Sequence, residues 1–224
     1  MTISITLYII IVTSLISFWG FNNDHVVDRL IFYPPAVIKN NEWYRFFTCG
    51  LVHRDIPHLI FNMYALFLFG QGQQKTGTEY MFEYVFDNKG KALYLIMYVL
   101  ALGVCLIPTF FKNKNNHYYR SLGASGAVSA VVFAYITMNP LQGVGLIFIP
   151  VFIPGFLFGT IYLIISYFLS KRKGSSINHS AHIWGALFGV VFVLAMAPLF
   201  SNEPIVGNFI ESIKEFDFRK TFMY

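Results

Sequence analysis

The chain has 224 residues, of which 56% are hydrophobic and only 12% are charged, and its net charge is +5. A soluble domain has about 25% charged residues, so this balance excludes an ordinary soluble protein and indicates an integral membrane protein in contact with the lipid bilayer. The 16 Lys and Arg residues are dispersed among short loops without a basic face or a nucleic-acid motif, which argues against nucleic acid as a partner.

Six apolar segments are predicted to be transmembrane helices, so the expected fold class is all-α, a polytopic bundle of six transmembrane helices. The first segment lacks the basic start and small-residue cleavage site of a signal peptide, and we interpret it as a retained helix. The second and fourth are short, with a polar or glycine-containing first turn, which indicates helices that begin below the membrane surface beside a protein-lined cavity. The segments cover residues 3–19, 57–71, 92–111, 123–138, 145–169 and 180–200.

Two other regions are not predicted to span the membrane. The loop of residues 20–56 is long and aromatic, so we expect a folded or interfacial element there. Residues 1–200 then form one membrane domain, and residues 201–224 form a tail. A short interfacial helix is expected in that tail, because three apolar residues have helical spacing among mixed charges, namely Phe209, Ile213 and Phe216.

Polar residues begin three of the apolar segments, and these segments all start on the same side of the membrane. They are His58 and Asn62 in the second segment, Ser125 in the fourth and His182 in the sixth. An ionisable side chain at membrane depth is costly, so it is a functional hypothesis by default. A serine hydroxyl needs a base to act as a nucleophile. No Asp, Glu or Lys lies within the last three segments, so the sequence predicts a dyad of Ser125 and His182.

Small residues are spaced to bring the fourth and sixth segments together. Gly126, Ala130 and Ala134 recur every fourth position in one segment, and Gly185 and Gly189 do so in the other. Such faces let transmembrane helices approach closely. A close crossing would place the Ser125 hydroxyl within reach of the His182 imidazole.

An oxyanion also needs hydrogen-bond donors. The backbone N–H groups at the start of the fourth segment are free, and His58 and Asn62 share one helix face, so all of these are candidate donors. Two alternatives stay open: His182 is a structural hydrogen-bonding residue, and His58 with Asn62 only ties a loop to its helix. His179 and His182 are three residues apart, but no carboxylate or further helical His is suitably placed, so neither a metal nor a cofactor is expected.

Four motifs occur in order over most of the chain, and their combination resembles the rhomboid family of intramembrane serine proteases, in its bacterial six-helix form. The resemblance implies Ser125 as nucleophile and His182 as general base, with an oxyanion hole made by His58, Asn62 and the Ser125 amide. It also implies that Arg45 is a structural residue of the first loop. The motifs are Glu42–Thr48, His53 with His58–Asn62, Gly123–Gly126 and Ala181–Gly185.

The resemblance also implies an orientation. In the bacterial members the N-terminus is cytoplasmic and the cavity opens outward, which would place this chain in a bacterial inner membrane. Ten of the 16 Lys and Arg residues then lie outside and six inside, so the positive-inside rule favours the opposite orientation. We favour the orientation of the family, because the outer loops are expected to be folded or associated with lipid.

The sequence departs from the family at one position near the predicted dyad. Family members often place an aromatic residue one helical turn after the serine, where it packs on the catalytic imidazole. Here that residue is Ser129. Either another residue orients His182, or the geometry of its imidazole is looser than is usual in the family.

The fifth segment is a candidate lateral gate, through which a substrate helix would enter past the second segment. Prolines weaken a helix locally, and bulky rings pack adaptably. Lipid-facing aromatic residues beside proline kinks are the alternative interpretation. The segment contains Pro150 and Pro154 among Phe148, Phe152, Phe156 and Phe158.

The predicted function is a serine endopeptidase that cleaves peptide bonds in or near transmembrane helices, at small or helix-breaking residues of membrane-protein substrates. One alternative is a catalytically inactive rhomboid-like protein that binds membrane clients, although such a protein would not need both Ser125 and His182. A second alternative is a small transporter or channel, against which the absence of internal repeats and intramembrane acids argues.

Overall fold

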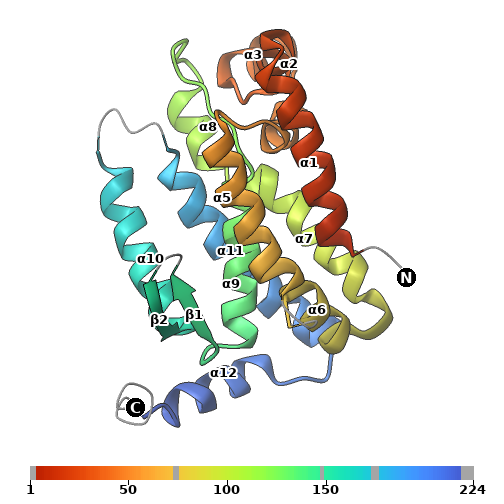
Figure 1. Ribbon diagram of the computed structural model, residues 1–224, viewed down its shortest axis with the longest axis vertical. Coiled ribbons are helices and arrows are strands. Elements are labelled where there is room, and N and C mark those ends of the chain that lie inside the picture. Colours follow the sequence, from red (N-terminus) through yellow and green to blue (C-terminus); the bar gives the residue numbers. More distant parts are fainter. Residues whose placement is uncertain (1–3, 73–75, 147–148, 173–176, 218–224) are drawn as a thin grey trace.

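The computed structural model describes residues 4–72, 76–146, 149–172 and 177–217. Figure 1 shows an elongated bundle whose long helices run along its long axis, with one short helix lying across an end. Phe148 of the predicted gate lies outside the described residues. The same holds for four of the cations counted in the loops, namely Lys75, Lys173, Arg219 and Lys220.

Helices form most of the fold. The long helices of the bundle are α1 (Ile5–Phe21), α5 (Ile56–Leu66), α7 (Gly90–Val104), α9 (Ser125–Met138), α10 (Gly155–Ser170) and α11 (His179–Phe200), and a π-helical turn (Phe67–Gln71) extends α5. The shorter helices are α2 (Asp24–Leu30), α3 (Pro34–Asn40), α4 (Arg45–Thr48), α6 (Thr78–Phe86), α8 (Ile107–Asn113) and α12 (Ile205–Lys214). Helices α1, α5, α9 and α11 overlap the predicted segments 3–19, 57–71, 123–138 and 180–200.

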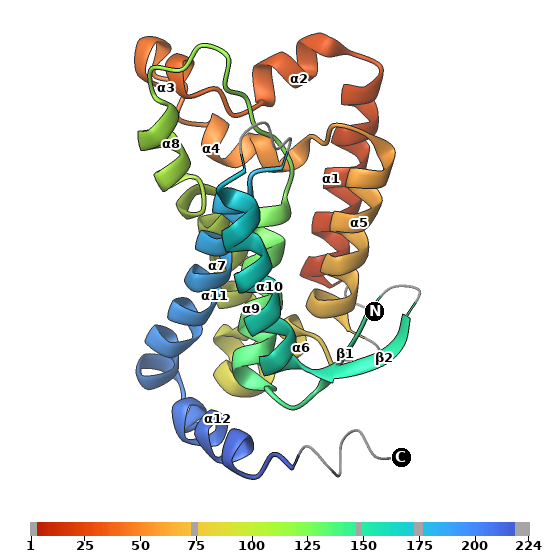
Figure 2. The same ribbon diagram turned by 90° about the vertical axis from the view of Figure 1, so that its left-hand side faces the viewer.

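Helix α9 is the core of the bundle, and Figure 2 shows it among the other helices. Every residue from Gly126 to Thr137 is buried. The outside of the bundle is apolar instead, with exposed side chains such as Leu15, Ile164 and Val191. A helix that is hydrophobic on all sides is buried, and an apolar exterior is what lipid contact requires.

Two helical stretches are long and apolar enough to cross a membrane by length and composition, namely Thr78–Asn113 and His179–Phe200. Three shorter apolar helices accompany them, α1, α9 and α10. The described part of the chain is therefore mostly helical.

The structure corrects the prediction of one helix over residues 145–169. Its first part is a β-hairpin, in which β1 (Gly143–Leu146) pairs antiparallel with β2 (Ile149–Pro154), and only α10 is helical. Pro150 and Pro154 lack the N–H that a helix interior needs, and the β-branched residues between them favour a strand. The predicted proline kinks in a fifth helix are therefore wrong.

The predicted helix over residues 92–111 also differs from the structure. It is divided into α7 and α8, with a break at Cys105 and Leu106. Pro108 lies in the first turn of α8, where its missing N–H costs nothing, and this favours a new helix start there.

The first loop is folded, as expected, and Arg45 is at its centre. The Arg45 side chain is buried, donates to the carbonyl oxygens of Asp28 and Ile31 at 2.7 Å each, and pairs with Glu42. The hydrogen bond from Arg45 holds the pKa of the Glu42 carboxyl below its usual range, so the pair is ionised. One guanidinium thus joins three parts of the loop.

The tail contains the expected short helix, α12, which crosses the end of the bundle opposite the first loop (Figure 1). Its Ile205 is buried, whereas Val206 and Ile210 are exposed. An interfacial position for α12 stays a prediction.

Candidate active site

Ser125 is the first residue of α9, after a turn that requires glycine. Gly123 has a φ of +109°, and a Cβ there would lie 2.7 Å from Cε1 of His58. The chain therefore enters α9 with the His58 ring directly against its backbone. The first N–H groups of a helix have no carbonyl partner within the helix. The N–H groups of Ser125 and Gly126 are therefore candidate hydrogen-bond donors at the positive end of the helix dipole.

His182 lies in the first turn of α11, and its Nε2 is 2.7 Å from Oγ of Ser125. This is the length of a good hydrogen bond. The two side chains meet because α9 and α11 cross without side chains between them: Gly185 lies on the backbone of Gly126, and Gly189 lies on that of Ala130. The structure therefore brings together the two residues predicted as a dyad, at the crossing that the small residues predicted.

His58 and Asn62 lie on α5 and line the same cavity as Ser125 and His182. The carboxylate of Asp55 caps α5 by accepting the His58 amide at 2.8 Å, which fixes where the helix begins. Asn62 is buried, and its Nδ2 donates to the His58 carbonyl at 2.9 Å. A carboxamide has two N–H donors, so one of them is left for a ligand in the cavity.

His53 stabilises the start of α9. From the sequence, His53 was named only as part of the motif with His58–Asn62 and was given no role. Its Nδ1 is 2.9 Å from Oγ of Ser17, and its Nε2 accepts from the Ala124 amide at 3.4 Å. Because the Ser17 hydroxyl donates to the Leu51 carbonyl, it accepts from His53, so the proton of the neutral ring is on Nδ1. Burial, and after it the nearby His58, lower the pKa of His53 to about 3, which keeps the ring neutral. A neutral His53 thus joins α1 to the residue before Ser125.

Tyr162 is the residue that the sequence analysis missed. It lies on α10, and its ring is stacked on the His182 imidazole, with centroids 6.3 Å apart and planes inclined by 17°. Its hydroxyl is 2.8 Å from Oγ of Ser129. The position that lacks the aromatic residue of the family thus contacts an aromatic residue from another helix. The sequence did offer one indication of this contact. Phe158 and Tyr162 are aromatic residues one helical turn apart in an apolar segment, so they share one face of the helix.

The cavity has a volume of about 930 Å³ and is open at one end of the bundle. Much of its lining is apolar, and both α5 and α10 contribute to it, with Phe61 from α5 and Phe158 from α10. Phe152 of the predicted gate lies instead on β2, where it is exposed. The cavity is large enough for an extended peptide segment, and it admits water from its polar end.

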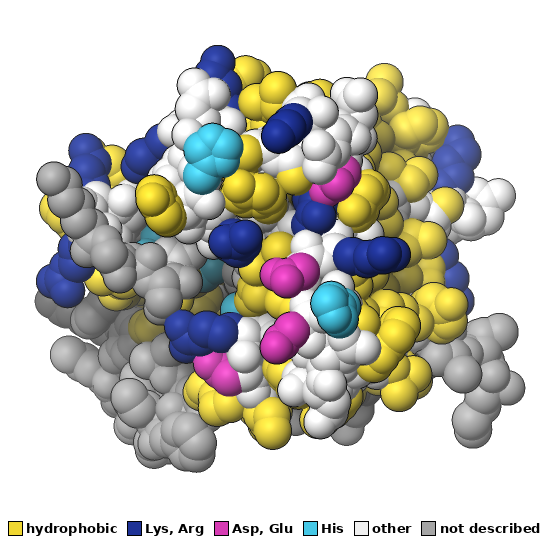
Figure 3. All heavy atoms as spheres, turned by 90° about the horizontal axis from the view of Figure 1, so that it is seen from above, with side chains coloured by type: hydrophobic (Ala, Val, Ile, Leu, Met, Phe, Trp, Pro, Cys, Tyr) yellow, Lys and Arg dark blue, Asp and Glu magenta, His cyan; other side chains and the backbone are white. Residues whose placement is uncertain are grey.

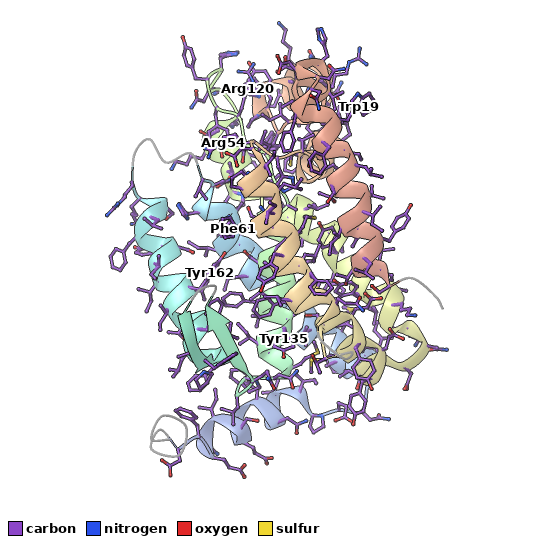
Figure 4. All side chains as sticks on the ribbon, viewed as in Figure 1. Trp19, Arg54, Phe61, Arg120, Tyr135 and Tyr162 are labelled. Carbon is purple, nitrogen blue, oxygen red and sulfur yellow. The ribbon has the colours of Figure 1, made fainter. Side chains whose placement is uncertain are left out.

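Charged residues gather at the mouth of the cavity, and Figure 3 shows more Lys and Arg than Asp and Glu on that end of the bundle. Arg54, Asp55 and Arg120 line the mouth, and Figure 4 shows both arginines above Phe61 and Tyr162. The pKa of Asp55 is held below its usual range, first by the His58 amide and then by Arg54, so it is an ionised N-cap. Among the described lining residues Asp55 is the one carboxylate, and it is already bound to these partners.

The described residues include no group of three His, Cys, Asp or Glu side chains that is arranged to hold a metal ion. His179 does contact His182, with ring centroids 5.6 Å apart and edge to face. The chemistry that these side chains support is that of a serine next to an imidazole, in a cavity with several N–H donors.

Comparisons with known proteins agree in one family. A profile of the rhomboid domain matches residues 40–199. RHOMBOID-like protein 12, mitochondrial, of Arabidopsis thaliana is 31% identical over 160 residues, which are 68% of this chain and 46% of that protein. Rhomboid protease GlpG of Photorhabdus laumondii is 29% identical over 197 residues, which are 85% of this chain and 60% of that protein.

A third relative is the presenilin-associated rhomboid-like protein, mitochondrial, of Mus musculus, which is 29% identical over 162 residues, or 69% of this chain and 39% of that protein. The chain thus spans between 39% and 60% of the lengths of these three relatives. The profile match covers most of the chain and includes both Ser125 and His182. The chain belongs to the rhomboid family of integral membrane proteins.

Proposed function

We propose that the chain is an intramembrane serine endopeptidase, which hydrolyses peptide bonds in or near the transmembrane helices of other membrane proteins. The observation that carries the proposal is the distance of 2.7 Å between Nε2 of His182 and Oγ of Ser125. A serine hydroxyl so close to an imidazole is activated as a nucleophile. The name of the relative from Photorhabdus laumondii, a rhomboid protease, supports the same class of reaction.

The reaction begins when Oγ of Ser125 attacks the carbonyl carbon of the substrate and Nε2 of His182 takes the hydroxyl proton. The carbonyl oxygen becomes an oxyanion, which accepts hydrogen bonds from the Ser125 amide and from the side chains of His58 and Asn62. The C–N bond then breaks, and the leaving amine receives the proton from His182. Water attacks the acyl-enzyme in the same way, releases the carboxylate and restores Ser125.

We further propose six membrane spans, made by α1, α5, α7 with α8, α9, α10 and α11. Helices α5 and α9 are short for a full span. Their ends can lie below the membrane surface, because α9 is surrounded by protein and α5 lines the cavity. The substrate is a transmembrane helix with small or helix-breaking residues at the cut site, because an intact helix keeps its carbonyl groups in hydrogen bonds. It enters between α5 and α10, and the reaction needs no cofactor or metal.

The proposed location is a bacterial inner membrane, with the cavity open to the outer side. The relative from Photorhabdus laumondii supports a bacterial membrane, whereas the relatives from Arabidopsis thaliana and Mus musculus carry mitochondrial names. A cysteine-accessibility experiment at Tyr118, which is fully exposed in the loop before α9, tests the orientation. Labelling of Tyr118→Cys by an impermeant reagent added to intact cells is expected, and labelling only after lysis would contradict the outward orientation.

A fluorophosphonate probe tests the proposed reaction. The Ser125 oxygen displaces fluoride from the phosphorus of the probe, while the hydroxyl proton passes to His182. We expect the detergent-purified protein to be labelled, and Ser125→Ala and His182→Ala to remain unlabelled although folded. If the wild-type protein reacts no faster than Ser125→Ala, the proposal fails, and an inactive protein that binds membrane clients becomes the better explanation.

A further inference from the structure

The imidazole of His182 is held between two helices other than its own. On one side it contacts Ser125 of α9, and on the other the Tyr162 ring of α10 lies nearly parallel to it. Centroid distances of 4.5 to about 7 Å are typical of interacting aromatic pairs, and 6.3 Å falls within that range. Figure 4 shows Tyr162 extending from α10 toward the interior of the bundle, below the two arginines of the mouth.

The Tyr162 ring is itself fixed by a short chain of hydrogen bonds. Oγ of Ser129 donates to the Ser125 carbonyl at 2.9 Å, which uses its one proton. The hydroxyl of Tyr162, 2.8 Å away, therefore donates to Ser129. Tyr162 is thus connected, through Ser129, to the backbone of Ser125 in the first turn of α9.

Aromatic neighbours restrict the ring from the remaining directions. The Phe133 ring of α9 is 5.7 Å from it, and the Phe158 ring of α10 is 6.2 Å from it. The opposite face of α10 is different, because Ile164 and Tyr167 are exposed there. One face of α10 is therefore joined to the dyad, and the other faces lipid.

We propose that Tyr162 is the positioning residue for His182, and that the geometry of the dyad therefore depends on where α10 lies. This inference rests on the proposed function. Since position 129 is a serine, α9 supplies no ring of its own to hold the imidazole. A displacement of α10 into the lipid, such as entry between α5 and α10 requires, removes Tyr162 from His182. The dyad is then misaligned while the cavity is open at its side and realigned once α10 has returned.

This coupling has a functional consequence. The nucleophile is at its least reactive during the interval in which lipid and non-substrate helices have access to the cavity. Ser125 becomes reactive only when the bound substrate segment allows α10 to return against α11. Small residues at the cut site leave room for α10 to return to its place. Substrate selectivity therefore depends on the contact between Tyr162 and His182 as well as on the shape of the cavity.

The experiment measures the rate of fluorophosphonate labelling as a function of probe concentration in Tyr162→Leu and Tyr162→Phe. For Tyr162→Leu we expect the maximal labelling rate to fall about tenfold with an unchanged half-saturating concentration, because stacking orients the base and does not bind the probe. Tyr162→Phe keeps the ring but loses the hydrogen bond to Ser129, so its labelling rate is expected to lie between those of Tyr162→Leu and wild type. The matched control is Tyr167→Leu, since Tyr167 is on the same helix but exposed.

A swapped variant provides the rescue. Ser129→Tyr combined with Tyr162→Ser moves the ring from α10 to α9, and we expect labelling to recover toward the wild-type rate. If Tyr162→Leu does not fold, Tyr162→Met, which fills most of the volume without a ring, replaces it. A folded Leu or Met variant that reacts at the wild-type rate would overturn the inference but leave the proposed function intact. Equal reactivity of wild type and Ser125→Ala would instead overturn the proposed function.

Discussion

A methyl group on Gly185 of α11 would lie 2.0 Å from the carbonyl oxygen of Gly126 in α9. That oxygen belongs to the backbone of the residue after Ser125, so it has no rotamer by which to move aside. The distance between the two helices, and with it the contact between Ser125 and His182, is set by the absence of a side chain at this point.

The first prediction follows from that contact. In Gly185→Ala the two helices must separate, so we expect fluorophosphonate labelling of Ser125 to fall by about 10²-fold, since misplacement by about 1 Å has effects of that size. Thermal unfolding in detergent should occur at a lower temperature as well. The control is Gly207→Ala in α12, where the added Cβ meets only Pro204, at 3.7 Å. Unchanged labelling in Gly185→Ala would show that the close crossing is not what positions the dyad.

The second prediction concerns Arg45 in the first loop. Arg45→Ala leaves the carbonyl oxygens of Asp28 and Ile31 without their donor and Glu42 without its cation. Hydrogen bonds to a charged group contribute about 1.5–3 kcal/mol, so we expect the free energy of unfolding to fall by about that amount. Arg45→Lys should recover only part of it, because an ammonium group does not reproduce the fork of a guanidinium. Equal stability of Arg45→Ala and wild type, by thermal unfolding, would contradict the structural role.

The dyad contact and the helix crossing were predictable from the sequence, for a physical reason. A serine and a histidine at the starts of helices that enter from one side have the same depth, and small residues at spacing four define which faces meet. Hydropathy placed the ends of α1, α9 and α11 within two residues of where they lie. The roles of Ser125 and His182 in a reaction are still a proposal.

Neither the β1–β2 hairpin nor the contact between Tyr162 and His182 was predictable from the sequence, and the two have a common cause. Hydropathy treats Ile149–Pro154 as part of a helix, because apolar residues in a strand and in a helix have the same transfer free energy. With the start of α10 misplaced, the face that Tyr162 presents to α11 is also unknown. A contact between residues 20 positions apart in the sequence, as Tyr162 and His182 are, then depends on three-dimensional placement alone.

The third prediction concerns pH and His53. Its folded-state pKa is lowered to about 3, mainly by burial, from 6.5 for the free side chain. The unfolded chain therefore binds one more proton between these values, so the stability that His53 contributes is present above pH 6.5 and is lost as the pH falls toward 3. In His53→Gln, which keeps one donor and one acceptor, we expect the unfolding temperature to depend less steeply on pH between 6.5 and 4. A slope equal to that of wild type would contradict a neutral, buried His53.

The fourth prediction tests the oxyanion donors. Asn62→Ala removes a donor that lines the cavity, and we expect the maximal rate of peptide-bond cleavage to fall by about 10²-fold with little change in KM. Asn22→Ala is a matched control, because Asn22 donates to the carbonyl of Phe18 four residues earlier, as Asn62 does to that of His58, but is exposed. If both variants cleave substrate like wild type, the Asn62 side chain only supports α5.

The last prediction separates lateral entry from chemistry. Phe61 of α5 and Phe158 of α10 both line the cavity, so cysteines at these two positions, joined by a reducible crosslinker, hold the helices together. A small fluorophosphonate reaches Ser125 through the open polar end, and with α10 held in place Tyr162 stays on His182, so labelling should persist. Cleavage of a transmembrane substrate should stop and should return on reduction, whereas the two single-cysteine variants treated with the same reagent should cleave throughout. Undiminished cleavage by the crosslinked protein would mean that substrates do not pass between α5 and α10, and the coupling of α10 to the dyad would then have no part in their admission.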